Sequence, residues 1–122
     1  MLGFNEKANL ELVIREKQNF SSILLNLTNY LRASGNNAQA RYVGKLSELI
    51  KEEDLGQFVN SLNTVDMWGG SGAVWEVYVE DNAEYKKFQR TIVELINLME
   101  NTKILKTGIA PIRQAFLKDL TR

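Results

Sequence analysis

The feature that most constrains the fold of this chain is a series of apolar residues at helical spacing over residues 5–34. They recur at intervals of three, four and seven positions, which is the pattern of one apolar stripe along an amphipathic helix. The stripe consists of Leu10, Val13, Phe20, Leu24, Leu27 and Leu31, and Ile14, Ile23 and Tyr30 widen it. We therefore expect a long helical segment that buries one side.

Two features divide and end this segment. Lys17 interrupts the apolar stripe, so the segment is either one helix or two helices with a bend near Gln18–Ser21. The sequence Ser34-Gly35-Asn36-Asn37 follows. Glycine suits the left-handed position after a helix, and asparagine can cap the next helix. We expect the first segment to end here and another helix to start at about Asn37.

The helical period continues in four later segments. It predicts helices over about residues 37–51 and 53–62, a long helix from Asp81 to Met99, and a last helix from Pro111. The expected inward side chains are Ala38, Tyr42, Val43, Leu46, Leu49 and Ile50, then Leu55, Phe58, Val59 and Leu62, then Tyr85, Phe88, Ile92, Leu95, Ile96 and Met99, and finally Ile112, Phe116, Leu117 and Leu120. Every predicted helix thus has an apolar face for a shared core.

The last two helices also carry terminal signals. Asp81 is placed to be an N-cap, and Glu84 stands three residues on as the reciprocal partner of a capping box. Thr107-Gly108 is a break between the two helices. Pro111 is tolerated only in the first turn of the helix that follows.

Residues 66–79 differ from the rest of the chain. Both tryptophans and three of the eight glycines lie within this stretch, which reads Asp-Met-Trp-Gly-Gly-Ser-Gly-Ala-Val-Trp-Glu-Val-Tyr-Val. Its end, Val74–Val79, has the β-branched and aromatic content of a short strand. One or two turns of a helix buried all round would have the same composition, and we favour helix.

These elements predict one all-α domain over residues 1–122. A chain of 122 residues has the size of a single domain and can bury one core. Five or six helices joined by short links favour a compact antiparallel bundle with the glycine- and tryptophan-rich loop in its middle.

The chain contains no cysteine and no histidine. Their absence removes disulfides, thiolate nucleophiles, imidazole bases and the commonest zinc ligands. We therefore expect a protein that is not an enzyme, with no catalytic residue, metal or cofactor. Its 15 cations balance its 15 acidic residues, which gives no general attraction to nucleic acid or anionic membranes. No signal segment or long apolar run stands out, so we expect a cytoplasmic protein.

Three interpretations of the run Gly69-Gly70-Ser71-Gly72 are open. It can be a tight turn that lets Trp68 and Trp75 pack close to the backbone, which we favour. It can be a protein-contact loop, because tryptophan is enriched at binding hot spots. It can also bind phosphate through backbone N–H groups, although it lacks the Gly-Lys-Ser/Thr ending of a P-loop.

Two nearby carboxylates, Glu76 and Glu80, are four residues apart and would share one face of a helix. Paired carboxylates can perform acid–base chemistry or hold a hard cation. Without a histidine or a clear third ligand, we favour a solvated acidic face.

The glycine run resembles an element of a family of small uncharacterised bacterial proteins, Gly-Gly-x-Gly-(Ser/Ala)-hydrophobic-x-(Asp/Glu). The matching residues are Gly69, Gly70, Gly72, Ala73, Val74, Trp75 and Glu76. The chain departs from the pattern in Trp68 before the glycines, in Ser71 for the usual methionine and in Glu76 for the usual aspartate. The resemblance covers about Leu24–Met99. It implies a small helical binder of the toxin-immunity type.

Our leading hypothesis is a cytosolic binding protein that neutralises a cognate bacterial toxin. The expected partner-binding residues are Asp66, Trp68, Gly69, Gly70, Gly72, Trp75, Glu76, Glu80, Asp81 and Glu84. An acidic patch of this kind would attract a basic toxin domain. The alternatives are a small-ligand or phosphate-binding domain that uses the loop Gly69–Gly72, and a structural homodimer.

Overall fold

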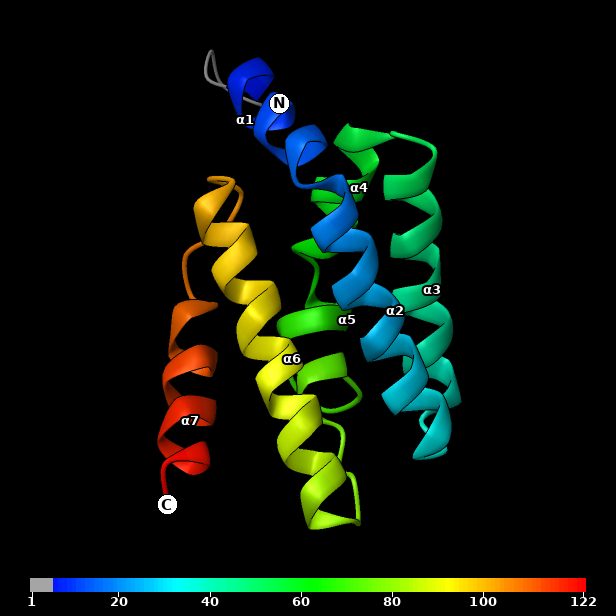
Figure 1. The fold of residues 1–122 in the computed structure, drawn as a ribbon, viewed down its shortest axis with the longest axis vertical. Coiled ribbons are helices and arrows are strands. Elements are labelled where there is room, and N and C mark those ends of the chain that lie inside the picture. The colour runs from blue at the N-terminus through cyan, green and yellow to red at the C-terminus, as the bar shows by residue number, and fades with distance from the viewer. Residues whose placement is uncertain (1–5) are drawn as a thin grey trace.

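A computed structural model describes residues 6–122, which form seven α-helices and one 3-10 helix and contain no strand (Figure 1). The helices are α1 (Glu6–Arg15), α2 (Lys17–Ala33), α3 (Asn37–Lys51), α4 (Leu55–Leu62), α5 (Val65–Trp68), η1 (Val74–Glu76), α6 (Asn82–Asn101) and α7 (Ala110–Leu120). The predicted all-α bundle is confirmed. Six of the helices have eight or more residues, and α5 is an additional single turn.

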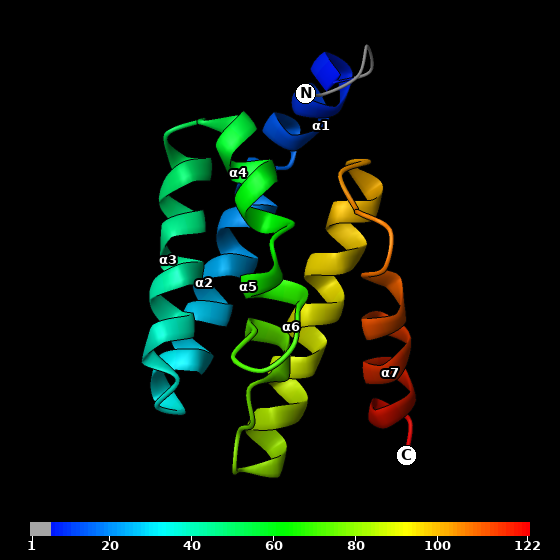
Figure 2. The ribbon, with the colours of Figure 1, turned by 180° about the vertical axis from the view of Figure 1, so that it is seen from behind.

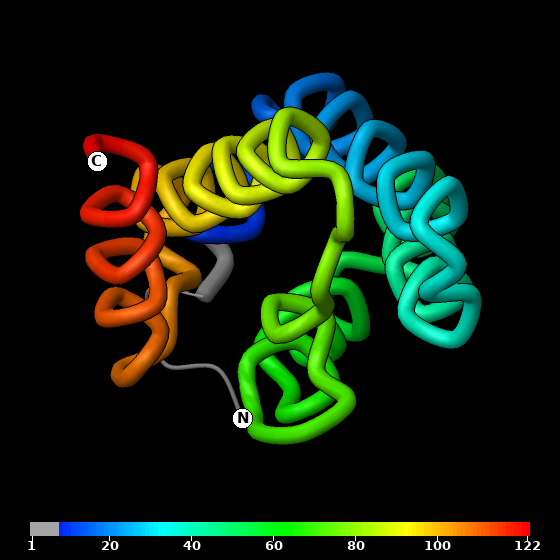
Figure 3. The backbone as a smooth tube through the Cα atoms, turned by 90° about the horizontal axis from the view of Figure 1, so that it is seen from below, coloured from blue at the N-terminus to red at the C-terminus, as the bar shows by residue number. Residues whose placement is uncertain are grey.

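A curved layer is formed by the four longest helices, which are α2, α3, α6 and α7. α3 packs against α2, α2 against α6, and α6 against α7. Seen from below, α7, α6, α2 and α3 follow one another along an arc, and α4, α5 and η1 occupy its concave side (Figure 3). α2 and α6 therefore form one face of the molecule, whereas α4 and α5 lie on the opposite face (Figures 1 and 2).

The core lies between the arc and the α4–α5 segment. Phe20 of α2 meets Phe58 of α4 edge to face, with ring centroids 5.3 Å apart. Met67 of α5 and Val74 of η1 are fully buried, so the irregular middle of the chain contributes to the core. Each large apolar side chain buried in this way stabilises the fold by about 1.5–3 kcal/mol. The largest of them are Phe20, Phe58, Phe88, Leu24, Leu27, Leu31, Leu46, Ile50, Leu62, Met67, Ile92 and Leu95.

α7 is attached mainly to α6. Its Phe116 packs edge-on against Phe88 of α6, with ring centroids 6.4 Å apart. Arg113 donates to the Glu100 carboxylate at 3.0 Å, and Gln89 Nε2 donates to Asp119 Oδ2 at 2.8 Å. The Arg113 hydrogen bonds and charge lower the pKa of the exposed Glu100 carboxyl.

Most of the helix-terminal signals in the sequence act as expected, but the asparagine cap of α3 does not form. Asn36 precedes α3 without a side-chain capping hydrogen bond, and its amide donates to the Ser34 hydroxyl. Gly35 and Gly108 adopt left-handed φ values of 81° and 97°, a conformation that glycine adopts without steric cost. Pro111 lies in the first turn of α7. Asp81 Oδ1 accepts a hydrogen bond from the Glu84 backbone N–H at 2.9 Å. The reciprocal half of the capping box is absent, because the Glu84 side chain pairs with Lys87 instead.

The first helical segment divides earlier than predicted. The helix is interrupted at Glu16, and not near Gln18–Ser21. Lys17 then begins α2, and its ammonium reaches the Lys51 carbonyl at 3.1 Å and Glu53 at 3.0 Å. The break lets α1 contact α4. Ile14, predicted to widen the buried stripe, is therefore 43% exposed. The predicted start of this segment at residue 5 lies outside the described residues.

Three further expectations were wrong. The helix predicted to start at residue 53 starts at Leu55, because Glu53 has a left-handed φ of 59° and ends the turn after α3. Ala38 and Leu117 were expected to point inward, but both are exposed. Ala38 lies in the first turn of α3, and Leu117 lies on the solvent side of α7.

Residues 74–79 form neither the favoured helix nor a strand. Only Val74–Glu76 is helical, as one 3-10 turn, and Val77 is already extended at φ −63° and ψ 146°. Val77 and Val79 point into the core while Tyr78 and Glu80 are exposed. This alternation is that of an extended chain, without a neighbouring strand. Glu76 and Glu80 therefore do not share a helix face. Among residues 6–122, no helix combines the length and apolar character that crossing a bilayer requires.

Candidate functional site

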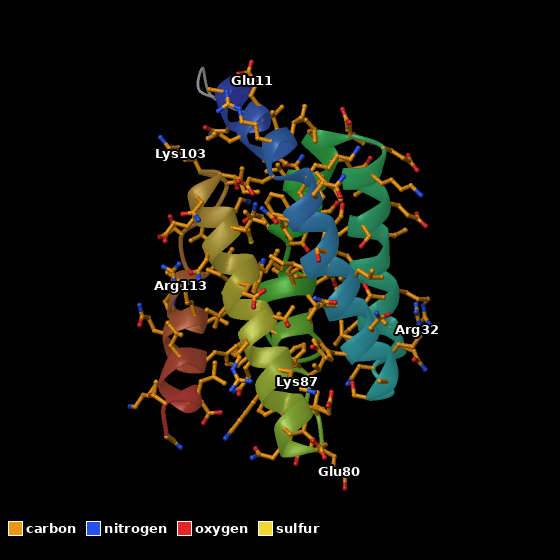
Figure 4. The ribbon with its side chains drawn as sticks, in the orientation of Figure 1. Glu11, Arg32, Glu80, Lys87, Lys103 and Arg113 are labelled. Carbon is orange, nitrogen blue, oxygen red and sulfur yellow. The ribbon has the colours of Figure 1, made fainter. Side chains whose placement is uncertain are left out.

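The strongest candidate site is a hollow of about 270 Å³ between the end of α2 and the segment that leads into α6. We call it the acidic hollow. Its lining residues are Tyr30, Ala33, Ser34, Val79, Glu80, Asp81 and Glu84. Three acidic residues from one short segment thus line the hollow together with residues of α2 that lie some fifty positions earlier in the chain. Figure 4 shows Glu80 at the end of the molecule, clear of the helices.

The three carboxylates of the hollow differ in their partners. Asp81 caps α6 through the backbone N–H of Glu84. Glu84 accepts a hydrogen bond from the Lys87 ammonium at 3.1 Å. This hydrogen bond and, to a smaller extent, the negative charge of Glu84 raise the pKa of Lys87. Among the described residues, Glu80 has neither a hydrogen-bond nor an ion-pair partner. Glu80 is therefore the carboxylate most available to an external cation.

The α2 side of the hollow provides a polar group and an apolar wall. The Ser34 hydroxyl donates to the Leu31 carbonyl and accepts from Asn36, so its single donor is already used. The Tyr30 hydroxyl has no hydrogen-bond partner among the described residues. Its ring, with Ala33 and the buried Val79, forms an apolar surface. A cation on an apolar stem would match this combination, with the stem on the wall and the charge near Glu80.

The helix ends add to the negative potential of the hollow. α2 ends beside it, and the C-terminal end of a helix carries a partial negative charge. The opposite partial charge at the start of α6 is already matched by Asp81, the N-cap. The hollow consequently attracts cations and repels anions.

The glycine- and tryptophan-rich loop, residues 66–76, lies outside the hollow; we call it the Gly–Trp turn. Its indole N–H groups are bound internally, from Trp68 to the Leu62 carbonyl at 2.7 Å and from Trp75 to the Gly69 carbonyl at 2.8 Å. The Trp75 ring also packs on Phe116 of α7, at 6.1 Å between centroids. Both tryptophans therefore hold the turn against its surroundings, in agreement with the tight-turn interpretation.

Two glycines of the turn are required by its geometry. A Cβ on Gly69 would stand 2.6 Å from the backbone oxygen of Val65. Gly72 has a left-handed φ of 88°, and its carbonyl accepts a hydrogen bond from Gln39 of α3. Gly70 has open space around it. Gly69 thus allows a close backbone approach and Gly72 a left-handed backbone conformation, and the turn opens only the three-residue η1. The dipole of so short a helix is small, so it contributes little to the binding of a phosphate.

The sequence-predicted residues accordingly fall into two groups. Glu80, Asp81 and Glu84 come together in the acidic hollow. Asp66 and Glu76 are exposed but do not line it. The remaining predicted residues, Trp68, Gly69, Gly70, Gly72 and Trp75, belong to the Gly–Trp turn. In the described part of the chain, no three acidic, histidine or cysteine side chains are arranged to hold a metal ion.

Sequence reasoning missed the α2 side of the hollow. Tyr30 was assigned to the apolar stripe, and Ala33 and Ser34 were treated as the end of a helix. A tyrosine at the edge of a stripe is a weak signal for a site, because its ring can be buried while its hydroxyl remains accessible. Comparison with family models, with curated proteins and with solved structures finds no match to this chain.

Proposed function

We propose that the protein is a non-catalytic binding protein that holds a basic segment of a partner protein in the acidic hollow. The observation that carries this proposal is the Glu80 carboxylate, which has no partner among the described residues and lines a hollow together with Asp81, Glu84 and Tyr30. A lysine or arginine side chain fits this chemistry, because its apolar stem can lie on a wall while its charged end stays near water.

The contribution of the acidic hollow to the binding free energy follows from the solvent exposure of its charged groups. Ion pairs at solvent-exposed positions typically contribute about 0.2–1 kcal/mol each. Complementary surface charge mainly speeds association and selects the partner. The hollow would therefore supply orientation and selectivity, and apolar contacts around it would supply the remaining affinity.

Neutralisation of a bacterial toxin is the biological role that we propose for this binding. The support is the resemblance of the Gly–Trp turn to an element of immunity-type proteins, together with a chain that lacks histidine and cysteine. A toxin that acts on nucleic acid needs a basic surface. An acidic hollow can cover such a surface and block it.

The binding proposal can be tested with a fluorescein-labelled hexalysine peptide as the probe, followed by anisotropy. Glu80→Lys should weaken binding about fivefold or more, and raised salt should weaken binding to the wild-type protein. Glu76→Lys is the matched control, because it makes the same change in net charge at an exposed carboxylate outside the hollow. Equal losses in both variants would show that overall charge, and not the hollow, attracts the probe.

The toxin role needs a second experiment with natural partners. The wild-type protein and both variants serve as baits for extracts of the native cell. We expect a basic protein that the wild type and the Glu76→Lys variant retain and the Glu80→Lys variant loses. Expression of that protein alone should arrest growth, and co-expression with this chain should restore it. A captured protein that is harmless on its own would contradict toxin neutralisation while leaving the binding function in place.

A further inference from the structure

The outer side of α2 is unusual because it carries no charge along most of its length. Between Lys17 and Arg32 the sequence has no acidic or basic residue. The exposed residues of this stretch are Gln18, Asn19, Ser22, Leu25, Asn26 and Asn29. A quarter of the chain is charged, and the solvent side of a surface helix is normally where such residues gather. The absence of charge therefore needs an explanation.

The neighbouring part of α6 continues this surface. A groove of about 350 Å³ runs between the two helices and is lined by Asn19, Ser22, Ile23, Asn26, Glu94, Asn97, Leu98 and Asn101. Glu94 is its only charged residue. We call the exposed residues of α2 from Gln18 to Asn29, with Asn97 and Asn101 of α6, the uncharged face. The two helices that carry it, α2 and α6, lie at the front of the molecule in Figure 1.

Apart from Glu94, which lies in the same groove, this surface has the composition of the centre of a protein interface. Interface centres are distinguished from other surface by a loss of charged residues, and their rims stay polar. Leu25 is 58% exposed and stands midway along α2. Lys17 and Arg32 lie at the two ends of the helix. The surface of α2 thus resembles an interface centre with its rim. It has an exposed leucine in the middle, amides around it and a charged residue at each end.

We infer that the uncharged face binds a second copy of this chain. In a two-fold dimer each surface must complement itself. Asparagine and glutamine amides do so readily, because each carries both donors and an acceptor. A face of one charge would repel its copy, and the acidic hollow is excluded on that ground.

The spacing along α2 also suits a two-fold axis. Ser22, Leu25 and Asn29 follow one another at intervals of three and four residues, so they form one line along the helix. With an axis through Leu25, the two α2 helices run antiparallel. The leucines then meet each other, and Ser22 of either copy lies opposite Asn29 of the other. Both polar residues can form hydrogen bonds across the pair.

The available area is sufficient for a small interface. α2 has 17 residues, which corresponds to about 25 Å at 1.5 Å per residue. Two packed helices are about 20 Å wide. A patch of this size corresponds to the low end of specific interfaces. The dimer is consequently expected to dissociate on dilution.

Sedimentation of the full chain across a hundredfold concentration range tests the inference. The wild-type protein should show a reversible monomer–dimer equilibrium. Leu25→Glu should raise the dissociation constant about tenfold or more, because two like charges would meet on the axis. Glutamate is a good helix former, so the variant should keep its helical circular dichroism and its melting temperature. Leu117→Glu is the control, since Leu117 is also exposed but lies on α7.

A mixing experiment tests the symmetry itself. Leu25→Lys should also weaken the homodimer, and an equimolar mixture of the Leu25→Glu and Leu25→Lys variants should restore a dimer. A wild-type protein that stays monomeric at every concentration would overturn the inference, as would a dimer that only Leu117→Glu disrupts. Glu80→Lys should leave the dimer intact, so the two proposals fail or stand separately.

Discussion

The Gly–Trp turn and the acidic hollow are adjacent in sequence but differ in how far their polar groups are satisfied. In the turn, both indole N–H groups have partners in the protein, and Gly69 and Gly72 are fixed by backbone geometry. In the hollow, Glu80 and the Tyr30 hydroxyl have no partner among the described residues. A segment with satisfied groups contributes to stability, whereas unsatisfied exposed groups remain available for binding.

This difference separates two effects that sequence alone assigned to a single surface. Substitutions in the turn should change the free energy of unfolding and leave binding of the hexalysine probe intact. Substitution of Glu80 in the hollow should do the reverse, whereas Asp81 affects both quantities because it also caps α6. Substitutions at four positions, Gly69, Trp75, Asp81 and Glu80, test the separation, from the largest expected change in stability to the smallest.

Gly69→Ala should give the largest change. Its Cβ would collide with the Val65 backbone oxygen, and we expect the free energy of unfolding to fall by about 2 kcal/mol or more. Gly70→Ala is the matched control, because a Cβ at Gly70 meets nothing. Its stability should be unchanged or higher by up to about 1 kcal/mol. Urea unfolding followed by circular dichroism measures both, and equal values would refute the close approach at Gly69.

Trp75→Phe should have the next largest effect. The variant leaves the Gly69 carbonyl without its donor and loosens the contact with Phe116, at a cost of about 1–2 kcal/mol. The same urea titration applies, and the hexalysine affinity should stay at the wild-type value. A loss of probe binding with no loss of stability would instead make Trp75 a contact residue.

Asp81 belongs to the hollow and also caps α6, so two substitutions separate its roles. Asp81→Ala should lower stability by about 1 kcal/mol through loss of the cap. Asp81→Asn should keep the cap, because asparagine caps as well as aspartate. Both variants lose the charge and should bind the hexalysine probe more weakly. If Asp81→Asn unfolds as easily as Asp81→Ala, the charge of this residue matters more than its hydrogen bond.

Glu80→Gln should change stability least, by no more than about 0.5 kcal/mol, because the side chain is exposed and has no partner within residues 6–122. Its hexalysine affinity should fall about two- to fivefold, which corresponds to one exposed ion pair. A large loss of stability in the melting curve would mean that Glu80 has a structural role that its position does not suggest.

The sequence predicted the helices and most of the core, because apolar periodicity reports which side of each helix is buried. It also predicted the Gly35 turn, the Asp81 cap and the position of Pro111, all of which depend on neighbouring residues. It did not predict the extended chain at Val77–Val79, where burial by surrounding helices replaces hydrogen bonding to a partner strand. Nor did it predict that Tyr30 and Glu80 line the same hollow, because periodicity carries no information about which helices meet.

The attachment of α7 has a consequence for motion in the native protein. This helix is held mainly by α6, through Phe116 and the polar contacts of Arg113 and Asp119. A terminal element with one principal neighbour detaches at a lower free energy than the rest of a domain. Amide hydrogens of α7 should exchange with deuterium ahead of those in α2. Because Trp75 packs on Phe116, each detachment of α7 should also expose one face of the Trp75 indole ring to water.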